Sequence, residues 1–178
     1  MRLLGQRAIL AQMQDTTTIR QAVAADVDAI CRIYNHYVLE STVTFEEQAV
    51  SSVDMSRRIA ETISAALPWL VTEQAGDVKG YACASNWKAR SAYRHSTETT
   101  IYLAPDALGR GLGTRLYQAL LDRLADGGRH VAIGGIALPN DASIALHQRL
   151  GFRKVAHFCE VGFKFERWID TTYWQRML

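Results

Sequence analysis

The sequence predicts one α/β domain in which helices are interleaved among mostly antiparallel strands. The chain has 178 residues, about the length of a single domain. Its composition, 48% hydrophobic and 21% charged, is close to the globular average, so a sizeable core can form. Segments with apolar residues at helical spacing alternate with segments rich in β-branched and aromatic residues. This alternation predicts a mixed central sheet flanked by helices.

The composition also excludes several classes of function. The formal net charge is +2, from 20 basic and 18 acidic residues, which is too balanced for a dedicated nucleic-acid binder. No apolar run approaches the roughly 20 residues that a membrane span needs. The first residues also lack the apolar core of a secretory signal. We therefore expect a soluble, cytoplasmic protein without a nucleic-acid or membrane partner.

The cysteines do not indicate a metal site. Cys31, Cys83 and Cys159 lie far apart, form no Cys-x-x-Cys pair, and have no histidine at zinc-ligand spacing. We expect three reduced and mostly buried thiols, and no metal.

The chain begins with a segment that has no clear period. We expect residues 1–17 to form a loosely attached extension or a short extra helix, ahead of a domain over 18–178. The segment TIRQAV (18–23) predicts a strand. Asp26 begins a helix, because apolar side chains recur at helical spacing after it. They are Val27, Ile30, Tyr34 and Tyr37.

A second helix, over 51–67, is followed by a series of strands. Pro68 separates this helix from the first strand, and Gly76-Asp77 makes a tight turn that joins the first two strands in a hairpin. The third strand stops at Pro105. The three strands are WLVTEQ (69–74), VKGYACASNW (78–87) and TETTIYLAP (97–105).

The second half of the chain alternates helix and strand. A helix over 114–126 is predicted by leucines that recur every four residues. A strand over 130–138 follows, and Asn140 is a good N-cap for a helix over 142–150. The remainder, 152–178, predicts two closing strands. The recurring leucines are Leu112, Leu116, Leu120 and Leu124.

A glycine-rich turn, GRGLG, lies between the third strand and the leucine-striped helix. Gly109, Gly111 and Gly113 permit a tight turn and leave backbone N–H groups bare at the positive end of a helix, which suits a phosphate or pyrophosphate. Such turns are common, so a purely structural turn is the alternative. No Gly-Lys-Ser/Thr follows, as a P-loop requires, and Thr114 stands where the dinucleotide fingerprint needs glycine.

Several motifs in one order resemble a known family. GRGLG resembles the pyrophosphate-binding motif of the GNAT superfamily of acyl-CoA-dependent N-acyltransferases, and NDASIALHQRLGF resembles its second motif. Together with them, IYNHYVLESTVTFE, GYACASNWKARSAYRHSTETTIYLAP, IALPNDASIALHQRLGF and GFKFERWIDTTYWQ resemble the phosphinothricin acetyltransferase family. The resemblance runs from about Ile19 to the C-terminus and implies a single-domain GNAT fold.

The resemblance implies acetyl-CoA as co-substrate. The third strand is then expected to splay near Ile101–Leu103, so that the pantetheine arm adds alongside it and a backbone N–H near Leu103 polarises the thioester carbonyl. Leu108 departs from the superfamily, which usually carries Gln or Arg there, but the backbone donors remain. The residues expected to bind the cofactor are Ile101, Tyr102, Leu103, Gly109, Arg110, Gly111, Leu112, Gly113, Thr114, Asn140 and Arg149.

Two residues are candidates for catalysis. The resemblance makes Glu98 the general base, acting directly or through water, and the two-residue strand period puts it on the same side as Thr100 and Tyr102. The alternative for Glu98 is an exposed carboxylate or a salt-bridge partner. His147 stands where many superfamily members carry a tyrosine that protonates the leaving thiolate. A histidine in the middle of an amphipathic helix is more often a hydrogen-bonded core residue, so its role stays open.

The loop Trp87–Tyr93 combines two cations with aromatic residues. Arginine binds carboxylate or phosphinate in a bidentate manner, which favours a pocket for an acidic substrate; the alternative is a solvated basic loop. Tyr34, Phe45 and Tyr93 are candidate walls of this pocket, although aromatic residues at such spacing are often core. The candidate substrate-binding residues are Lys88, Ala89, Arg90, Tyr93, Glu98, Phe45 and Tyr34.

The resulting functional hypothesis is an acetyl-CoA-dependent N-acetyltransferase. Its substrate would be the α-amine of a small amino-acid-like molecule, such as phosphinothricin, methionine sulfoximine or methionine sulfone. One alternative keeps the cofactor and changes the acceptor to another amine, such as a peptide N-terminus; another is a non-catalytic CoA-binding module. The aromatic-rich C-terminal strands also suggest a homodimer, which related enzymes often form.

Overall fold

The computed structural model describes residues 17–178, and most of the expected extension lies outside the described residues. Seven strands form one sheet in the order β1-β2-β3-β4-β5-β7-β6. The β4–β5 pair is parallel and the other pairs are antiparallel. The predicted mixed, mostly antiparallel α/β fold is therefore confirmed. The strands are β1 (Thr17–Gln21), β2 (Trp69–Gln74), β3 (Asp77–Asn86), β4 (Ser96–Leu103), β5 (Val131–Ala137), β6 (Arg153–Lys164) and β7 (Arg167–Met177).

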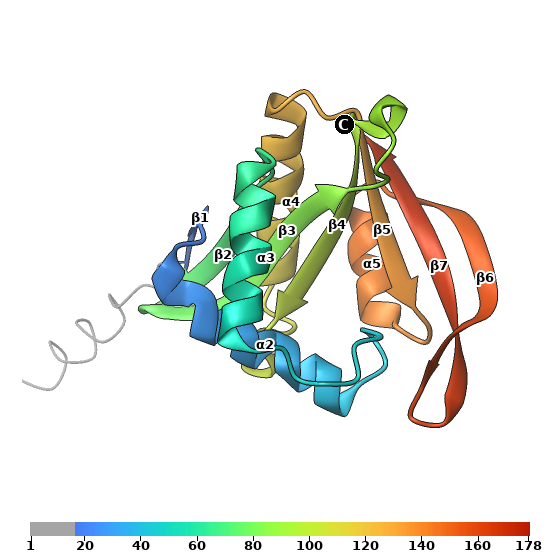
Figure 1. Ribbon diagram of the computed structural model, residues 1–178, viewed down its shortest axis with the longest axis horizontal. Coiled ribbons are helices and arrows are strands. Elements are labelled where there is room, and N and C mark those ends of the chain that lie inside the picture. The colour runs from blue at the N-terminus through green and yellow to red at the C-terminus, as the bar shows by residue number, and fades with distance from the viewer. Residues whose placement is uncertain (1–16) are drawn as a thin grey trace, which may run out of the picture.

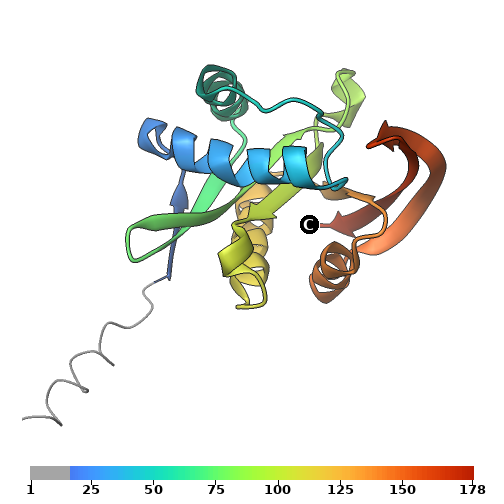
Figure 2. The same cartoon turned by 90° about the horizontal axis from the view of Figure 1, so that it is seen from below.

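Helices cover both faces of the sheet (Figures 1 and 2). The helices α2 and α3 pack on one face, and α4 and α5 pack on the other. The long helices are α2 (Val27–Glu40), α3 (Ser52–Ser64), α4 (Leu112–Asp126) and α5 (Asp141–Arg149), and the short 3-10 turns are η1 (Ala24–Asp26), η2 (Ser91–Tyr93) and η3 (Pro105–Ala107). No helix within 17–178 is long and apolar enough to cross a membrane.

Most of the predicted elements form, with small shifts at their ends. Asp26 is the last residue of the 3-10 turn η1 and the N-cap of α2, which begins at the next residue as expected; its carboxylate accepts from the Val23 N–H at 2.8 Å and pairs with Arg20 at 2.7 Å. The second helix stops at Ser64, three residues early, and Ala66 turns the chain in the left-handed region. The strand at the N-terminus begins at Thr17, at the last residue of the expected extension.

The core has one layer on each side of the sheet. The leucine stripe of α4 is fully buried, as the four-residue period predicts, and packs on Ala82 and Ala132 of the sheet. On the opposite face, Ile30 and Val38 of α2 and Met55 of α3 pack over β2 and β3. The sheet between them is therefore held rigidly from both sides, which fixes the strands that carry the candidate site.

The feature that matters most for function is a break in the middle of the sheet. β4 pairs with β5 only from Ser96 to Glu98, although both strands continue well beyond that point. Past the break, β4 remains paired with β3 and β5 remains paired with β7. The two strands diverge visibly below their point of contact (Figure 1). The separation therefore begins at Thr99, slightly before the expected Ile101–Leu103.

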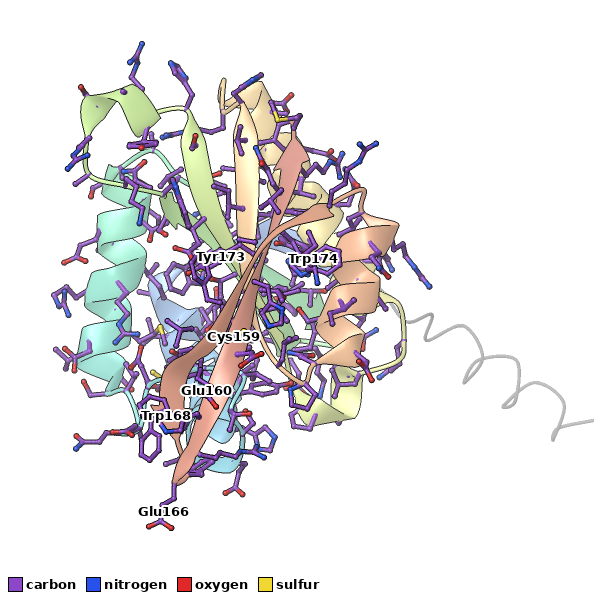
Figure 3. The ribbon with its side chains drawn as sticks, turned by 90° about the vertical axis from the view of Figure 1, so that its right-hand side faces the viewer. Cys159, Glu160, Glu166, Trp168, Tyr173 and Trp174 are labelled. Carbon is purple, nitrogen blue, oxygen red and sulfur yellow. The ribbon has the colours of Figure 1, made fainter. Side chains whose placement is uncertain are left out.

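The last two strands, β6 and β7, form a long two-stranded ribbon at the edge of the sheet opposite β1, called here the C-terminal ribbon. Successive residues of β7 face opposite sides, as strand geometry requires, and Figure 3 shows Tyr173 and Trp174 projecting in opposite directions. Tyr173 faces the side of α3, whereas Trp174 is buried with the core beside α5.

Candidate active site

A cleft of about 750 Å³ lies on the face of the sheet that carries α3 and crosses the break between β4 and β5. Its floor comes from β2, β3 and β4, and its walls come from α3, from the 43–46 segment and from β7. Among the candidates for catalysis and substrate binding, Tyr34, Phe45 and Glu98 line this cleft. Thr100 and Tyr102 line it too, which confirms that they share a side with Glu98.

Glu98 is the last residue of β4 that pairs with β5, and the two strands separate directly after it. Burial raises the pKa of its carboxyl, and the positive charge of Lys88 only partly offsets this effect. Gly135 of β5 lies between this carboxylate and Tyr173, since a Cβ there would stand in ordinary contact with both, 3.7 Å from Glu98 Oε1 and 3.4 Å from the Tyr173 ring. A partly desolvated carboxylate with a raised pKa is suited to accept a proton near neutral pH.

Tyr173 lines the cleft near Glu98 and is packed against a second aromatic ring. The Trp87 ring meets the Tyr173 ring edge to face, with centroids 5.4 Å apart. Lys88 Nζ lies 4.7 Å from the centroid of the Trp87 ring. The residue that follows β3 and the middle of β7, far apart in sequence, are thereby joined near Glu98.

The opposite wall carries an ion pair that the sequence analysis did not assign. Arg58 of α3 grips Glu46 with two bonds, of 2.6 and 3.1 Å. The Tyr34 hydroxyl donates to Glu46 Oε1 at 2.9 Å and lies 2.8 Å from Thr44 Oγ1. This network fixes the 44–46 segment against α2 and α3. These hydrogen bonds fix the orientation of the Tyr34 side chain in the cleft wall.

Phe45 covers the ribbon as well as the cleft. A Cβ on Gly162 of β6 would collide with the Phe45 ring, so glycine is required for this close approach. Lys164, two residues further along β6, is almost completely buried and donates to the carbonyls of Val38, at 2.7 Å, and Thr44, at 2.9 Å. Burial lowers the pKa of this ammonium group. Lys164 thus ties the end of α2 and the cleft wall to the C-terminal ribbon.

The basic loop does not line the cleft. Lys88, Ala89, Arg90 and Tyr93 are exposed, and of these four only Lys88 is close enough to Glu98 for its charge to act on the carboxylate. The positive charge of Lys88 stabilises the ionised form of Glu98. Arg90 lies at the start of the 3-10 turn η2. Their predicted contact with an acidic substrate stays a prediction.

His147 is buried under the floor of the site instead of facing the cleft. Its Nδ1 lies 2.8 Å from the Ser143 carbonyl, which can only accept, so Nδ1 carries the proton and Nε2 faces the Tyr117 hydroxyl at 3.1 Å. Tyr117 in turn lies 2.7 Å from Thr99 Oγ1, directly after the break. Gly134 makes room for the ring, since a Cβ there would collide with it. Burial lowers the pKa of His147, so the imidazole is held neutral.

The N-terminus of α4 fits a phosphate group. Gly109 and Gly111 adopt left-handed backbone angles, with φ of 72° and 76°, and a Cβ on either residue would meet no atom within 4 Å. Gly111 is the N-cap and no side chain caps the helix, so its first N–H groups lack the side-chain partner that many helices have. Gly113 lets the helix pack on β4, since a Cβ there would lie 3.2 Å from Leu103 Cδ1. Leu108 is exposed beside the turn.

The remaining cofactor candidates have mixed positions. Ile101, Tyr102 and Leu103 lie on the stretch of β4 that has no β5 partner. The Asn140 side chain accepts from the Ser143 N–H at 3.1 Å, which is the predicted N-cap of α5. Arg149 is exposed at the end of α5.

Sequence reasoning missed three residues of this cleft. Glu46 had no assigned role, and Arg58 lies on the polar side of an amphipathic helix, where an arginine is unremarkable as a pattern. Tyr173 is reached only through the pairing of β5 with β7, which no local signal encodes. The strand period of β7 does give its face, so it could have been placed once the pairing was known.

A half-buried carboxylate at a break in a sheet, on the strand that leads into a glycine turn and a helix N-terminus with no side-chain cap, defines a site for group transfer from a phosphate-bearing co-substrate. The chain belongs to the GNAT acetyltransferase family, because the model of the acetyltransferase (GNAT) domain matches residues 19–173. The protein is therefore an N-acetyltransferase.

Characterised relatives agree with this assignment. The chain is 42% identical to an L-amino acid N-acyltransferase of Escherichia coli strain K12, over 90% of this chain and 94% of that protein. It is 40% identical to an L-methionine sulfoximine/L-methionine sulfone acetyltransferase of Salmonella typhimurium, over 90% of this chain and 94% of that protein. The crystal structure of a phosphinothricin acetyltransferase from Sinorhizobium meliloti in complex with acetyl-CoA superposes with a TM-score of 0.88, at 40% identity and coverage of 92% and 89%.

Proposed function

We propose that this protein transfers the acetyl group of acetyl-CoA to the α-amine of a small amino-acid-like substrate, of the phosphinothricin, methionine sulfoximine or methionine sulfone type. The observation that carries the proposal is the position of Glu98, at the break between β4 and β5 and at one end of the cleft. The names of the relatives support the choice of an amino-acid-like acceptor.

The residues present fit acetyl-CoA. No side chain caps the N-terminus of α4, and the left-handed glycines keep the approach open for a pyrophosphate. Past Glu98, the side of β4 that faces β5 has no strand partner, so its backbone groups are available to an extended arm, except for the Leu103 carbonyl, which accepts from the Tyr37 hydroxyl at 2.7 Å. Acetyl-CoA supplies the activated acetyl thioester. A backbone N–H near Leu103 is the proposed donor to the thioester carbonyl.

Glu98 is the proposed general base. The α-ammonium group of an amino acid is mostly protonated near neutral pH and cannot attack until it loses a proton. Glu98 takes that proton directly or through an ordered water, and its raised pKa brings its basicity closer to that of the amine. The chain from Thr99 through Tyr117 to His147 supports the strand that carries Glu98 and fixes the break from below.

The acceptor is proposed to lie between Glu98 and the wall built by Tyr34, Phe45 and the Glu46–Arg58 pair. Lys88 and Arg90 of the exposed loop are the proposed partners of its acidic group, because the guanidinium of Arg58 is already occupied by Glu46.

Release of free thiol from acetyl-CoA, measured with a panel of amines, tests the proposal. We expect kcat/KM to be highest for phosphinothricin, methionine sulfoximine or methionine sulfone, and low for a peptide N-terminus and for spermidine. A higher value for the peptide would contradict the substrate class. Acetyl-CoA binding without thiol release on any amine would contradict the enzymatic function itself.

A further inference from the structure

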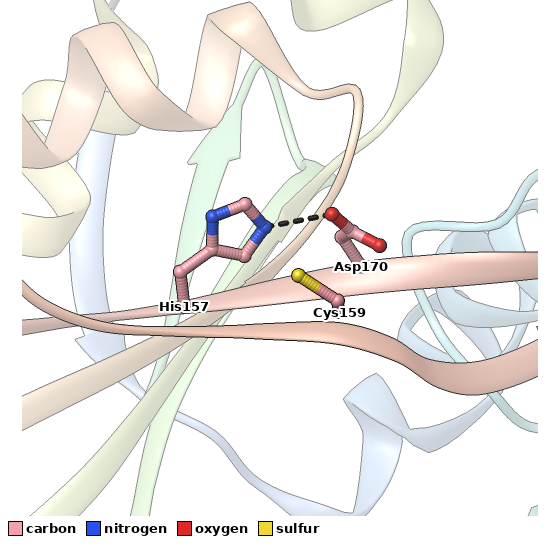
Figure 4. A group of neighbouring side chains, drawn as sticks. All are labelled: His157, Cys159 and Asp170. Carbon is pink, nitrogen blue, oxygen red and sulfur yellow. Dashed lines mark hydrogen bonds and ion pairs between the residues drawn. The ribbon is translucent and has the colours of Figure 1, made fainter.

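Three side chains of different chemistry converge on the C-terminal ribbon, apart from the cleft. His157 and Cys159 belong to β6 and Asp170 belongs to β7 (Figure 4). One ligand atom of each, a ring nitrogen, the Sγ atom and a carboxylate oxygen, lies within 4.8 Å of the other two. His157 Nε2 and Asp170 Oδ2 are hydrogen bonded at 2.7 Å. Asp170 faces away from the cleft, since its neighbour Thr171 lines the cleft and strand side chains alternate.

An irregular piece of backbone builds this cluster. The register between β6 and β7 slips between Phe158 and Gly162, and Glu160 within the slip has a left-handed φ of 50°. The Glu160 N–H donates to Asp170 Oδ1 at 2.9 Å, which holds the carboxylate across the bulge. Bulges re-aim side chains and are frequent next to functional sites, and a non-glycine residue in this region is uncommon. The strained bulge therefore lies at the point where the three groups meet.

The cluster has the donor atoms and the spacing of a zinc site. Imidazole nitrogen, thiolate sulfur and carboxylate oxygen all ligate Zn²⁺, at about 2.0–2.3 Å, so ligand atoms on a tetrahedral ion stand roughly 3.3–3.7 Å apart. The present separations, from 2.7 Å up to 4.8 Å, bracket that range. Small side-chain rotations would widen the His157–Asp170 pair and bring Cys159 closer, with no change in the strands.

We propose that His157, Cys159 and Asp170 bind one divalent ion of the zinc class, with water as the fourth ligand. In the single chain the three residues are partly or fully exposed, which leaves room for an ion and its water. On binding, the Cys159 thiol gives up its proton to solvent and the His157 proton resides on Nδ1, which leaves Nε2 for the metal. The mixed nitrogen, sulfur and oxygen set favours Zn²⁺ over Mg²⁺ or Ca²⁺, which prefer oxygen ligands alone.

The bound ion would act as a clip between the two strands. The His157–Asp170 hydrogen bond would be replaced by three bonds to the metal, from His157, Cys159 and Asp170. The bond from Cys159 would attach the bulge to the ion. This site is distinct from the acetyl-transfer site, so the clip changes the stability of the ribbon and leaves the acetyl-transfer chemistry alone. The search for histidine and cysteine at zinc-ligand spacing in the sequence did not find this site, because the third ligand, Asp170, comes from the neighbouring strand.

Titration of the full-length, chelator-treated protein with Co²⁺ tests the site. We expect one equivalent per chain, with a thiolate-to-cobalt charge-transfer band and the strong visible bands of tetrahedral Co²⁺, both abolished by added Zn²⁺. Cys159→Ser should remove the charge-transfer band, and His157→Gln should weaken binding by about tenfold or more. Cys31→Ser and His95→Gln are matched controls, because neither residue belongs to the cluster, and both should retain the parental spectrum.

Two results would overturn the proposal: no charge-transfer band in the parent protein at one equivalent of Co²⁺, or an unchanged band in Cys159→Ser. Zn²⁺ should also raise the Tm of the parent and leave that of Cys159→Ser unchanged; an equal rise in both would contradict the clip. Acetyl transfer by Cys159→Ser in the presence of chelator should match the parent, so failure of this site is distinguishable from failure of the enzymatic function.

Discussion

Each active-site candidate takes its chemistry from its immediate surroundings. Glu98 and Glu46 both border the same cleft, but only Glu46 has an arginine across from it. Burial pushes the pKa of Glu46 upwards, and the bonds from Arg58 and Tyr34 outweigh that effect and bring it below its usual range. Glu98 has no such partner and its pKa is raised. The environment therefore suits Glu98 to its proposed role as proton acceptor and favours the ionised form of Glu46 in the cleft wall.

The substrate anchor is the first prediction at the residue scale. Arg90→Ala should raise the KM for the acceptor, because the variant loses a charge-assisted bond to its acidic group, worth about 1.5–3 kcal/mol or roughly 10–150-fold. The KM for acetyl-CoA should hardly change. Arg94→Ala is the control, since Arg94 is equally exposed and donates to the Ser91 carbonyl in the same loop. Equal damage to both KM values would indicate misfolding, and no change in either would remove Arg90 from the site.

Individual residues also show where sequence reasoning stops. The strand period was enough to put Glu98, Thr100 and Tyr102 on one side, because alternation is a local property. The environment of His147 was not accessible in this way. Its partner Tyr117 lies on another helix, and its pocket exists because residue 134 of β5 is a glycine. Packing between elements decides such a residue, and a single sequence does not contain it.

At the scale of elements, the turn between β4 and α4 is the piece that should determine acetyl-CoA binding. Gly111→Val should raise the KM for acetyl-CoA strongly, because a branched side chain would strain the left-handed backbone and block the approach of phosphate. Gly76→Val provides the matched control, with a φ of 87° and equally open space in the β2–β3 hairpin. It carries the same kind of strain at a distant place.

A kinetic comparison of these two variants separates strain from binding. If both lose stability and only Gly111→Val loses affinity for acetyl-CoA, the turn is the phosphate site. An unchanged affinity in folded Gly111→Val would show that the site lies elsewhere. Leu108→Arg should leave the affinity unchanged or improve it, because the natural side chain offers no donor to lose.

Lys164 gives a second prediction at this scale. Lys164→Met removes the donor from the carbonyls of Val38 and Thr44, which should lower the free energy of unfolding by about 1–3 kcal/mol. The released 41–46 segment should raise the KM for the acceptor without affecting that for acetyl-CoA. Lys154→Met, on the exposed part of the same strand, should change neither value. An acceptor KM equal to that of the parent would show that the cleft wall does not depend on this tether.

The elements themselves follow from the sequence more completely than their assembly does. Leucine spacing predicted the buried stripe of α4, and the Gly76-Asp77 turn predicted the β2–β3 hairpin, because both signals are local. The position of β7 between β5 and β6 is a long-range choice, and it is what brings Tyr173 to Glu98. The break between β4 and β5 was expected only from the resemblance to a family.

At the scale of the whole molecule, the C-terminal ribbon leaves an apolar surface uncovered. Large exposed apolar residues gather on β6, β7 and their turn, an arrangement that is unusual for a monomer and typical of an interface. We propose that this ribbon forms the interface of a homodimer. The residues concerned are Val155, Phe158, Val161, Phe163, Phe165 and Trp168.

Sedimentation of charged variants tests the dimer. Phe163 and Trp168 are cross-strand neighbours with ring centroids 4.9 Å apart, so Trp168→Glu should place an unpaired charge in the centre of the interface and yield monomers. Val53→Glu introduces the same charge at an even more exposed apolar position on α3 and should leave the dimer intact. A parent protein that sediments as a monomer would contradict the proposal.

The central claim is that Glu98 removes the proton from the acceptor amine, and the pH dependence of kcat in Glu98→Gln tests it most directly. In the parent, kcat should fall on the acid side, at a pH above the ordinary range of a glutamate because burial raises the pKa of Glu98. Glu98→Gln keeps the shape but cannot take a proton, so kcat at neutral pH should fall by about 10²–10⁴-fold, with partial recovery at high pH where the amine is already neutral. Its KM for acetyl-CoA should stay near that of the parent, and Glu40→Gln, exposed at the end of α2, should behave as the parent throughout. A folded Glu98→Gln protein with the parental kcat at neutral pH would contradict the account.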